Sequence, residues 1–85
     1  MTISERKGVI FMLRINYYEN HKVTETEKIY NNSSVYDYIN AYRDAANKAG
    51  YRIRVIGPSI QAMRWVAYIE VVGQPDGEYV KVEGF

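Results

Sequence analysis

One segment of the chain repeats its apolar residues at helical spacing, and it lies between segments that alternate apolar and polar residues. In residues 34–49 the apolar side chains recur three or four positions apart, which places them on one face of a helix. Ser34 and Asp37 have the spacing of a capping box, and Gly50 is the residue type that commonly ends a helix. Because 85 residues have room for only one core, this helix has to pack on whatever the other segments form.

The flanking segments are expected to form strands. Alternation of apolar and polar residues predicts one strand over residues 8–18 and a polar second strand from Val23 to Tyr30. Three more strands are expected after the helix: Tyr51–Ile56, ended by Gly57-Pro58-Ser59, then Met63–Val72, and finally Glu78–Val82. The predicted fold is therefore a single α+β domain of order ββαβββ, with a mostly antiparallel five-stranded sheet and one helix packed on one face.

Basic residues are distributed unevenly, although the formal net charge is only +1. Residues 43–69 contain five basic residues and one acidic residue, whereas residues 70–85 contain one basic and four acidic residues. Arg52 and Arg54 lie two positions apart in a predicted strand, so their side chains project from the same face. Because one helix cannot cover both faces of a five-stranded sheet, we expect this face to be open or covered by a partner.

The side chains predicted on that face have the chemistry of an RNA-binding surface. Guanidinium groups bind phosphates with paired hydrogen bonds, and aromatic rings stack on unpaired bases. We expect RNA contacts from Arg14, Arg52, Arg54, Arg64, Lys28 and Tyr68, with Tyr18 and Lys22 close by. The alternative is a solvated face on which the arginines pair across the strands with Glu25, Glu27 or Glu70.

Three apolar residues are predicted on the same face as the arginines. Ile10, Met12 and Val66 make that face more apolar than an ordinary solvated surface. A symmetric homodimer would cover them, and a homodimer is therefore expected.

Several classes of function are disfavoured by what the sequence lacks. The chain has no cysteine, so it has no disulfide and no thiolate metal site. His21 is the only histidine and lies in a predicted turn, without a placed acid or base partner. We expect no catalytic residues, no metal and no cofactor. The longest apolar run, Val9 to Leu13, is too short to span a bilayer, and the expected location is the cytoplasm.

The chain resembles a known class of proteins in three features. These are its length, the single helix Ser34–Ala49 between β segments, and the abundance of Asn, Tyr, Lys and Ile. In these features the chain resembles the small early proteins with which bacteriophages disarm host defences, some of which bind RNA and counter the endoribonuclease toxin of a toxin–antitoxin system. The resemblance implies a non-catalytic inhibitor of an RNA-acting defence enzyme in the host cytoplasm. The alternatives are an inhibitor of the anti-CRISPR type, acting through protein contacts only, and a structural homodimer.

Overall fold

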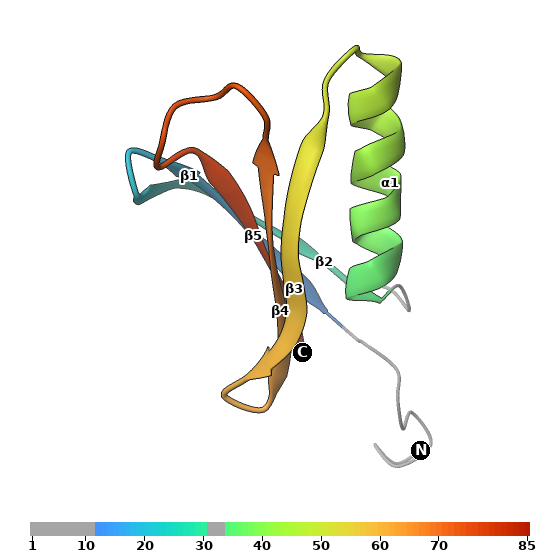
Figure 1. The fold of residues 1–85 in the computed structure, drawn as a ribbon. Helices are drawn as coiled ribbons and strands as arrows, with labels where there is room; N and C mark the ends of the chain where they lie inside the picture. The colour runs from blue at the N-terminus through green and yellow to red at the C-terminus, as the bar shows by residue number, and fades with distance from the viewer. Residues whose placement is uncertain (1–11, 31–33) are drawn as a thin grey trace.

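The computed structural model describes residues 12–30 and 34–85, and it confirms the predicted ββαβββ order (Figure 1). The elements are β1 (Leu13–Glu19), β2 (Lys22–Ile29), α1 (Val35–Lys48), β3 (Ile53–Gln61), β4 (Arg64–Val71) and β5 (Tyr79–Gly84). The strands form one antiparallel sheet in the order β2-β1-β5-β4-β3, with α1 on one face. Residues 8–11 of the first predicted strand lie outside the described residues.

The sheet consists of two hairpins joined by the last strand. β1 pairs with β2 and β3 pairs with β4, while β5 lies between β1 and β4 and pairs with both. Each hairpin turns through two residues with positive φ, Asn20-His21 in the first and Ala62-Met63 in the second. Two successive positive φ angles define the type I′ turn, whose twist matches that of the strands it joins.

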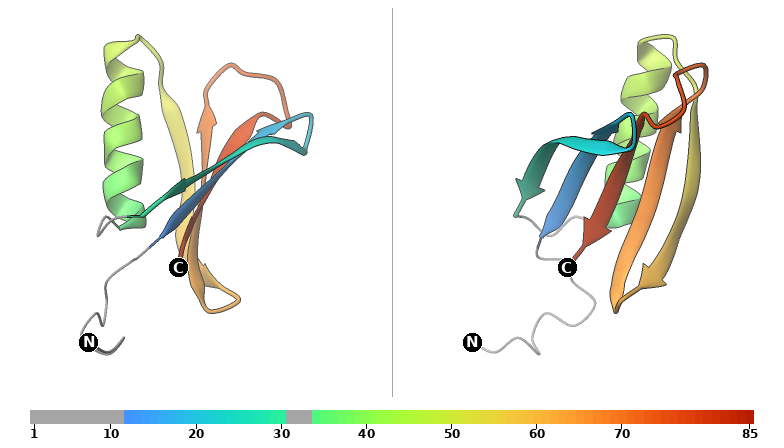
Figure 2. Two further views of the ribbon diagram at one scale, coloured as in Figure 1. Left: turned by 180° about the vertical axis from the view of Figure 1, so that it is seen from behind. Right: turned by 90° about the vertical axis from the view of Figure 1, so that its left-hand side faces the viewer.

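The core lies between α1 and one face of the sheet. The capping box predicted at Ser34 and Asp37 is present and begins the helix. Buried core residues come from α1, β1, β4 and β5: Val35, Ile39, Leu13, Ile15, Ala67, Ile69, Val80 and Val82. The helix contacts β3, β4 and β5. Figure 2 shows it against this half of the sheet, with β1 and β2 twisting away from it.

The third strand is longer than the sequence indicates. It was expected to end at Ile56, before Gly57-Pro58-Ser59, but β3 continues through these residues to Gln61. A bulge between Ile56 and Ser59 accommodates the glycine and the proline. Since β3 is at the edge of the sheet, a proline without an N–H group is tolerated there.

Gly57→Ala is expected to lower the free energy of unfolding by about 1–3 kcal/mol. Gly57 has φ +91°, and a Cβ added there would lie 2.9 Å from the backbone oxygen of Val66. Gly50→Ala is the matched control, because Gly50 has φ +87° with nothing within 4 Å of an added Cβ. The control should cost only the backbone strain, roughly 1 kcal/mol. Urea denaturation measures both, and equal losses would contradict this account of the bulge.

Candidate nucleic-acid interface

Most of the predicted site residues lie on the face of the sheet opposite α1. Arg14 of β1 is paired in register with Lys28 of β2 on one side and with Glu83 of β5 on the other. Glu83 is paired in turn with Val66 of β4. Because directly paired residues point to the same face, these side chains share one surface, which we call the uncovered face.

A buried carboxylate organises the basic residues of the uncovered face. The Oε1 atom of Glu83 accepts a hydrogen bond from Arg14 Nε at 2.9 Å and one from Asn16 Nδ2 at 3.3 Å. Its Oε2 atom lies 3.5 Å from a guanidinium nitrogen of Arg64 and 3.9 Å from Lys81 Nζ. The side chain of Glu83 is only 6% exposed. These four charged residues, Arg14, Arg64, Lys81 and Glu83, form the Glu83 cluster, which keeps a net positive charge.

The basic neighbours hold Glu83 in its ionised form. Burial by itself raises the pKa of a carboxyl group, because the charged form loses its water. The hydrogen bond from Arg14 and the charges of Lys81, Arg14 and Arg64 outweigh burial, and the pKa of Glu83 is lowered. The carboxylate therefore fixes the positions of three cations instead of titrating near neutral pH.

The ring of Phe85 positions two of these cations. The guanidinium carbon of Arg14 lies 4.7 Å from the centroid of the Phe85 ring, and that of Arg64 lies 4.3 Å from it. Both distances are within the range of a cation–π contact. The backbone N–H of Phe85 donates to the carbonyl of Met12 at 2.8 Å, which ties this ring to the beginning of β1.

Three tyrosines on the uncovered face form an aromatic row beside the Glu83 cluster. Tyr18 and Tyr79 are stacked with their ring centroids 4.5 Å apart, and Tyr68 meets Tyr79 edge-on at 6.0 Å. Lys81 Nζ lies 6.0 Å from the centroid of Tyr68 and so connects the row to the cluster. All three tyrosines are partly exposed. They offer rings on which bases can stack, next to cations that can bind phosphates.

Two of the predicted arginines lie apart from this arrangement. Arg54 is 72% exposed on edge strand β3 and donates to Glu70 through Nε at 3.0 Å and a terminal nitrogen at 2.8 Å. Arg52 is exposed and precedes β3. The structure therefore brings together Arg14, Arg64, Tyr18 and Tyr68, with Lys28 exposed at the far edge beside Arg14. Arg52 and Arg54 border the face at the opposite edge.

The acidic residues expected to pair with the arginines do so only in part. Glu70 pairs with Arg54, as the alternative of a solvated face predicts. Glu27, however, accepts a hydrogen bond from Tyr17 on the face that carries α1, and Glu25 is paired with Tyr17 on that face. Sequence analysis missed Glu83, Lys81, Phe85 and Tyr79 as site residues. The predicted fifth strand ended at Val82, whereas β5 continues to Gly84 and brings Glu83 into the sheet.

The apolar residues predicted to need a partner are largely accounted for within the chain. Val66 is only 2% exposed, so it needs no second copy to cover it. Met12 is partly buried, and Ile10 lies outside the described residues. The homodimer stays a prediction and loses the support that Val66 was expected to supply.

Within residues 12–30 and 34–85, no group of three or more His, Cys, Asp or Glu side chains is placed to hold a metal ion. In the same part of the chain, no helix has the length and hydrophobicity that crossing a membrane requires. Comparison of the chain with family models, with curated proteins and with solved structures finds no match. The resemblance to phage anti-defence proteins therefore stays a prediction from the sequence.

Glu83→Gln is expected to lower the free energy of unfolding at pH 7 by about 1–3 kcal/mol, because three clustered cations lose their shared carboxylate. A lowered pKa in the folded state means that Glu83 stabilises the protein above the ordinary pKa of a glutamate, about 4.3. That stabilisation is lost as the pH falls further. The difference between wild type and variant should therefore shrink between pH 5 and pH 3, as denaturation at several pH values would measure.

Glu70→Gln is the matched control for this substitution. It removes a carboxylate whose partner Arg54 is largely exposed, and such surface pairs contribute about 0–1 kcal/mol. If both variants lose the same stability, or if the loss in Glu83→Gln does not depend on pH, Glu83 does not organise the cluster.

Proposed function

We propose that this protein binds single-stranded RNA on its uncovered face and blocks an RNA-acting enzyme without turnover of its own. The observation that carries the proposal is the contact between two features of one surface. The Glu83 cluster supplies cations for phosphates, and the aromatic row supplies rings for unpaired bases. Surfaces that bind single strands combine these two features in the same way.

The cations of the uncovered face keep the capacity to bind phosphate. A guanidinium has five N–H donors, and its contacts within the Glu83 cluster use only some of them. Arg64 meets Glu83 at 3.5 Å with its side chain 35% exposed. Lys81 is 3.9 Å from the same carboxylate and 26% exposed. Lys28, paired in register with Arg14, adds an exposed charge toward the edge of the sheet.

Inhibition without catalysis agrees with the chemistry of this surface. Arginine, lysine and tyrosine side chains can hold a strand. The chain has no cysteine, and its single histidine, His21, lies at the end of the aromatic row with its ring centroid 6.1 Å from that of Tyr79. Cleavage would need a second acid or base placed beside it. A protein that holds RNA can keep the strand from an RNA-cleaving enzyme. The resemblance to phage anti-defence proteins supports an endoribonuclease toxin of the bacterial host as that enzyme, and a phage-encoded inhibitor in the host cytoplasm.

One observation favours a second candidate, an inhibitor that acts through protein contacts only. Arg14 and Arg54 each donate to a carboxylate of the same chain at 2.8–3.0 Å, and this reduces the charge they offer to RNA. Salt separates the two functions. Phosphate contacts make affinity fall steeply as salt increases, whereas a largely apolar protein interface changes little.

Arg64→Gln combined with Lys81→Gln should weaken the binding of single-stranded RNA and reduce its dependence on salt. Each lost phosphate contact lowers the slope of log affinity against log salt by about 0.7. The double variant Arg43→Gln, Lys48→Gln is the matched control, since it removes the same charge from exposed positions of α1. Titration of a labelled uridine oligomer at several salt concentrations, followed by fluorescence anisotropy, gives both quantities.

The two double variants decide between a site and a general charge effect. Equal losses in both would mean that RNA responds only to net charge. The inhibitor that acts through protein contacts only would be favoured if the wild type does not bind RNA but binds a toxin enzyme with an affinity that does not depend on salt. Cleavage of the oligomer by the purified protein would contradict inhibition without turnover.

Tyr68→Leu should weaken RNA binding by about 1–3 kcal/mol, the contribution of stacking one base on an aromatic ring. The slope of affinity against salt should stay unchanged, because no phosphate contact is lost. Tyr68→Phe retains the ring and should bind RNA like the wild type. If Tyr68→Leu also binds like the wild type, the aromatic row does not stack bases.

A further inference from the structure

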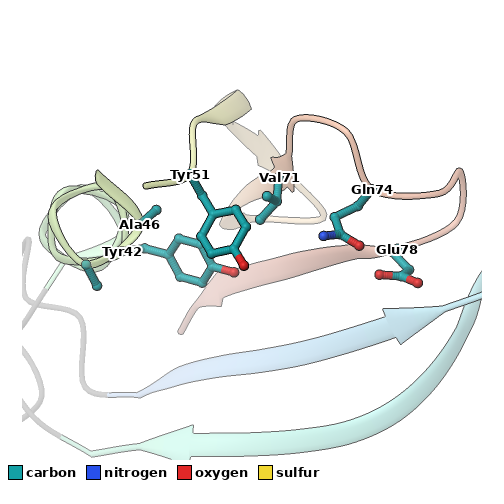
Figure 3. Close-up of a pocket in the computed structure, with 7 residues that line it drawn as sticks. Tyr42, Ala46, Tyr51, Val71, Gln74 and Glu78 are labelled. Carbon is teal, nitrogen blue, oxygen red and sulfur yellow. The ribbon is translucent and has the colours of Figure 1, made fainter. Parts of the chain in front are cut away.

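The other face of the sheet carries a groove that the helix leaves open. A pocket of about 490 Å³ lies between the C-terminal half of α1 and the loop that joins β4 to β5. Figure 3 draws the residues that line it and labels Tyr42, Ala46, Tyr51, Val71, Gln74 and Glu78. A second pocket, of about 210 Å³, shares Tyr42, Val71, Gln74 and Glu78 with the first and continues to Tyr17 and Glu19 of β1. We call the two adjoining pockets the tyrosine groove.

The offset of α1 creates this groove. The helix contacts β3, β4 and β5, and the end of β1 that includes Tyr17 and Glu19 lines the second pocket. The hydroxyl groups of Tyr17 and Tyr38 lie 3.5 Å apart and link β1 to α1 at one end of the groove. At the other end, the rings of Tyr42 and Tyr51 form part of the wall (Figure 3). The groove is thus an aromatic channel with an apolar floor that includes Ala46 and Val71.

The charged residues that line the tyrosine groove are acidic, while two basic residues lie close to it. Lys22 is paired in register with Glu19, and Arg54 lines a third pocket that shares Glu78 with the groove. Glu78 and Glu19 are the charged residues that line its two pockets, and among the described residues no lysine or arginine lines either pocket. On neighbouring β2, Glu27 accepts a hydrogen bond from the Tyr17 hydroxyl at 3.1 Å, and Glu25 is paired with Tyr17. The uncovered face on the other side of the sheet carries the Glu83 cluster and is positive.

We propose that the tyrosine groove binds a basic peptide segment of a partner protein. Aromatic rings attract guanidinium and ammonium groups through their faces. Carboxylates complete the recognition. Glu78 lines the groove and Glu27 is hydrogen-bonded to Tyr17, which also lines it, so both can pair with the same cations. An anionic strand such as RNA is repelled here, and a neutral apolar ligand gains nothing from the carboxylates. The inference does not depend on RNA binding, although Tyr18 and Tyr79 of the aromatic row also line the second pocket.

The test uses two labelled decapeptides, one alternating Arg with Gly and one alternating Gln with Gly, titrated with the full chain by fluorescence anisotropy. The arginine peptide should bind, and the glutamine peptide should bind at least about tenfold more weakly. The double variant Glu27→Gln, Glu78→Gln should weaken binding of the arginine peptide by about tenfold, which corresponds to about 1.4 kcal/mol. The double variant Asp44→Asn, Glu70→Gln removes the same charge outside the groove and should change affinity less than about twofold.

A second measurement locates the bound peptide independently of these variants. In amide NMR spectra, the arginine peptide should shift Tyr42, Ala46 and Gln74 and leave Arg14 and Lys81 unchanged. Any of three results would overturn the proposal: equal affinity for the two peptides, equal losses of peptide affinity in the two double variants, or NMR shifts of residues on the uncovered face. The proposal would also be overturned if the free protein self-associates and the double variant Glu27→Gln, Glu78→Gln abolishes that self-association. The groove would then bind a second copy of the chain.

Discussion

The pairing of β5 with β1 on one side and β4 on the other is the interaction on which both faces of this structure depend. Without it, the two hairpins would remain separate, and two-stranded hairpins are at most marginally stable in water. With it, the strands share one sheet, and α1 has an apolar surface on which to pack. Val80 and Val82 complete the core on that surface, while Lys81 and Glu83 point to the other.

Alternation along β5 couples the core to the candidate site. Because successive residues of a strand point to opposite faces, the register that buries Val82 also places Glu83 between Arg14 and Arg64. A shift of one residue would put the carboxylate in the core and the valine among the cations. The strong preference for burying Val82 therefore enforces the geometry of a charged cluster that contributes little to hydrophobic stability.

The same sheet presents surfaces of opposite charge. Basic side chains and an aromatic row share the uncovered face, and glutamates border a groove lined with tyrosines beside α1. The two proposals together describe a protein that holds a polyanion on one face and a basic protein segment in the tyrosine groove.

Local patterns in the sequence determined the helix, its capping by Ser34, the order ββαβββ, and the common face of Arg14 and Tyr68, since periodicity and capping depend on neighbouring residues alone. They also ended two strands too early: β3, where the bulge at Gly57 resembles a strand end, and β5, which continues past Val82 to Gly84. The strand order was decided only by tertiary packing. Glu83 meets Arg14, which is 69 positions away in the chain, because β5 buries its valines between the two hairpins, and no local pattern encodes which strands will become neighbours.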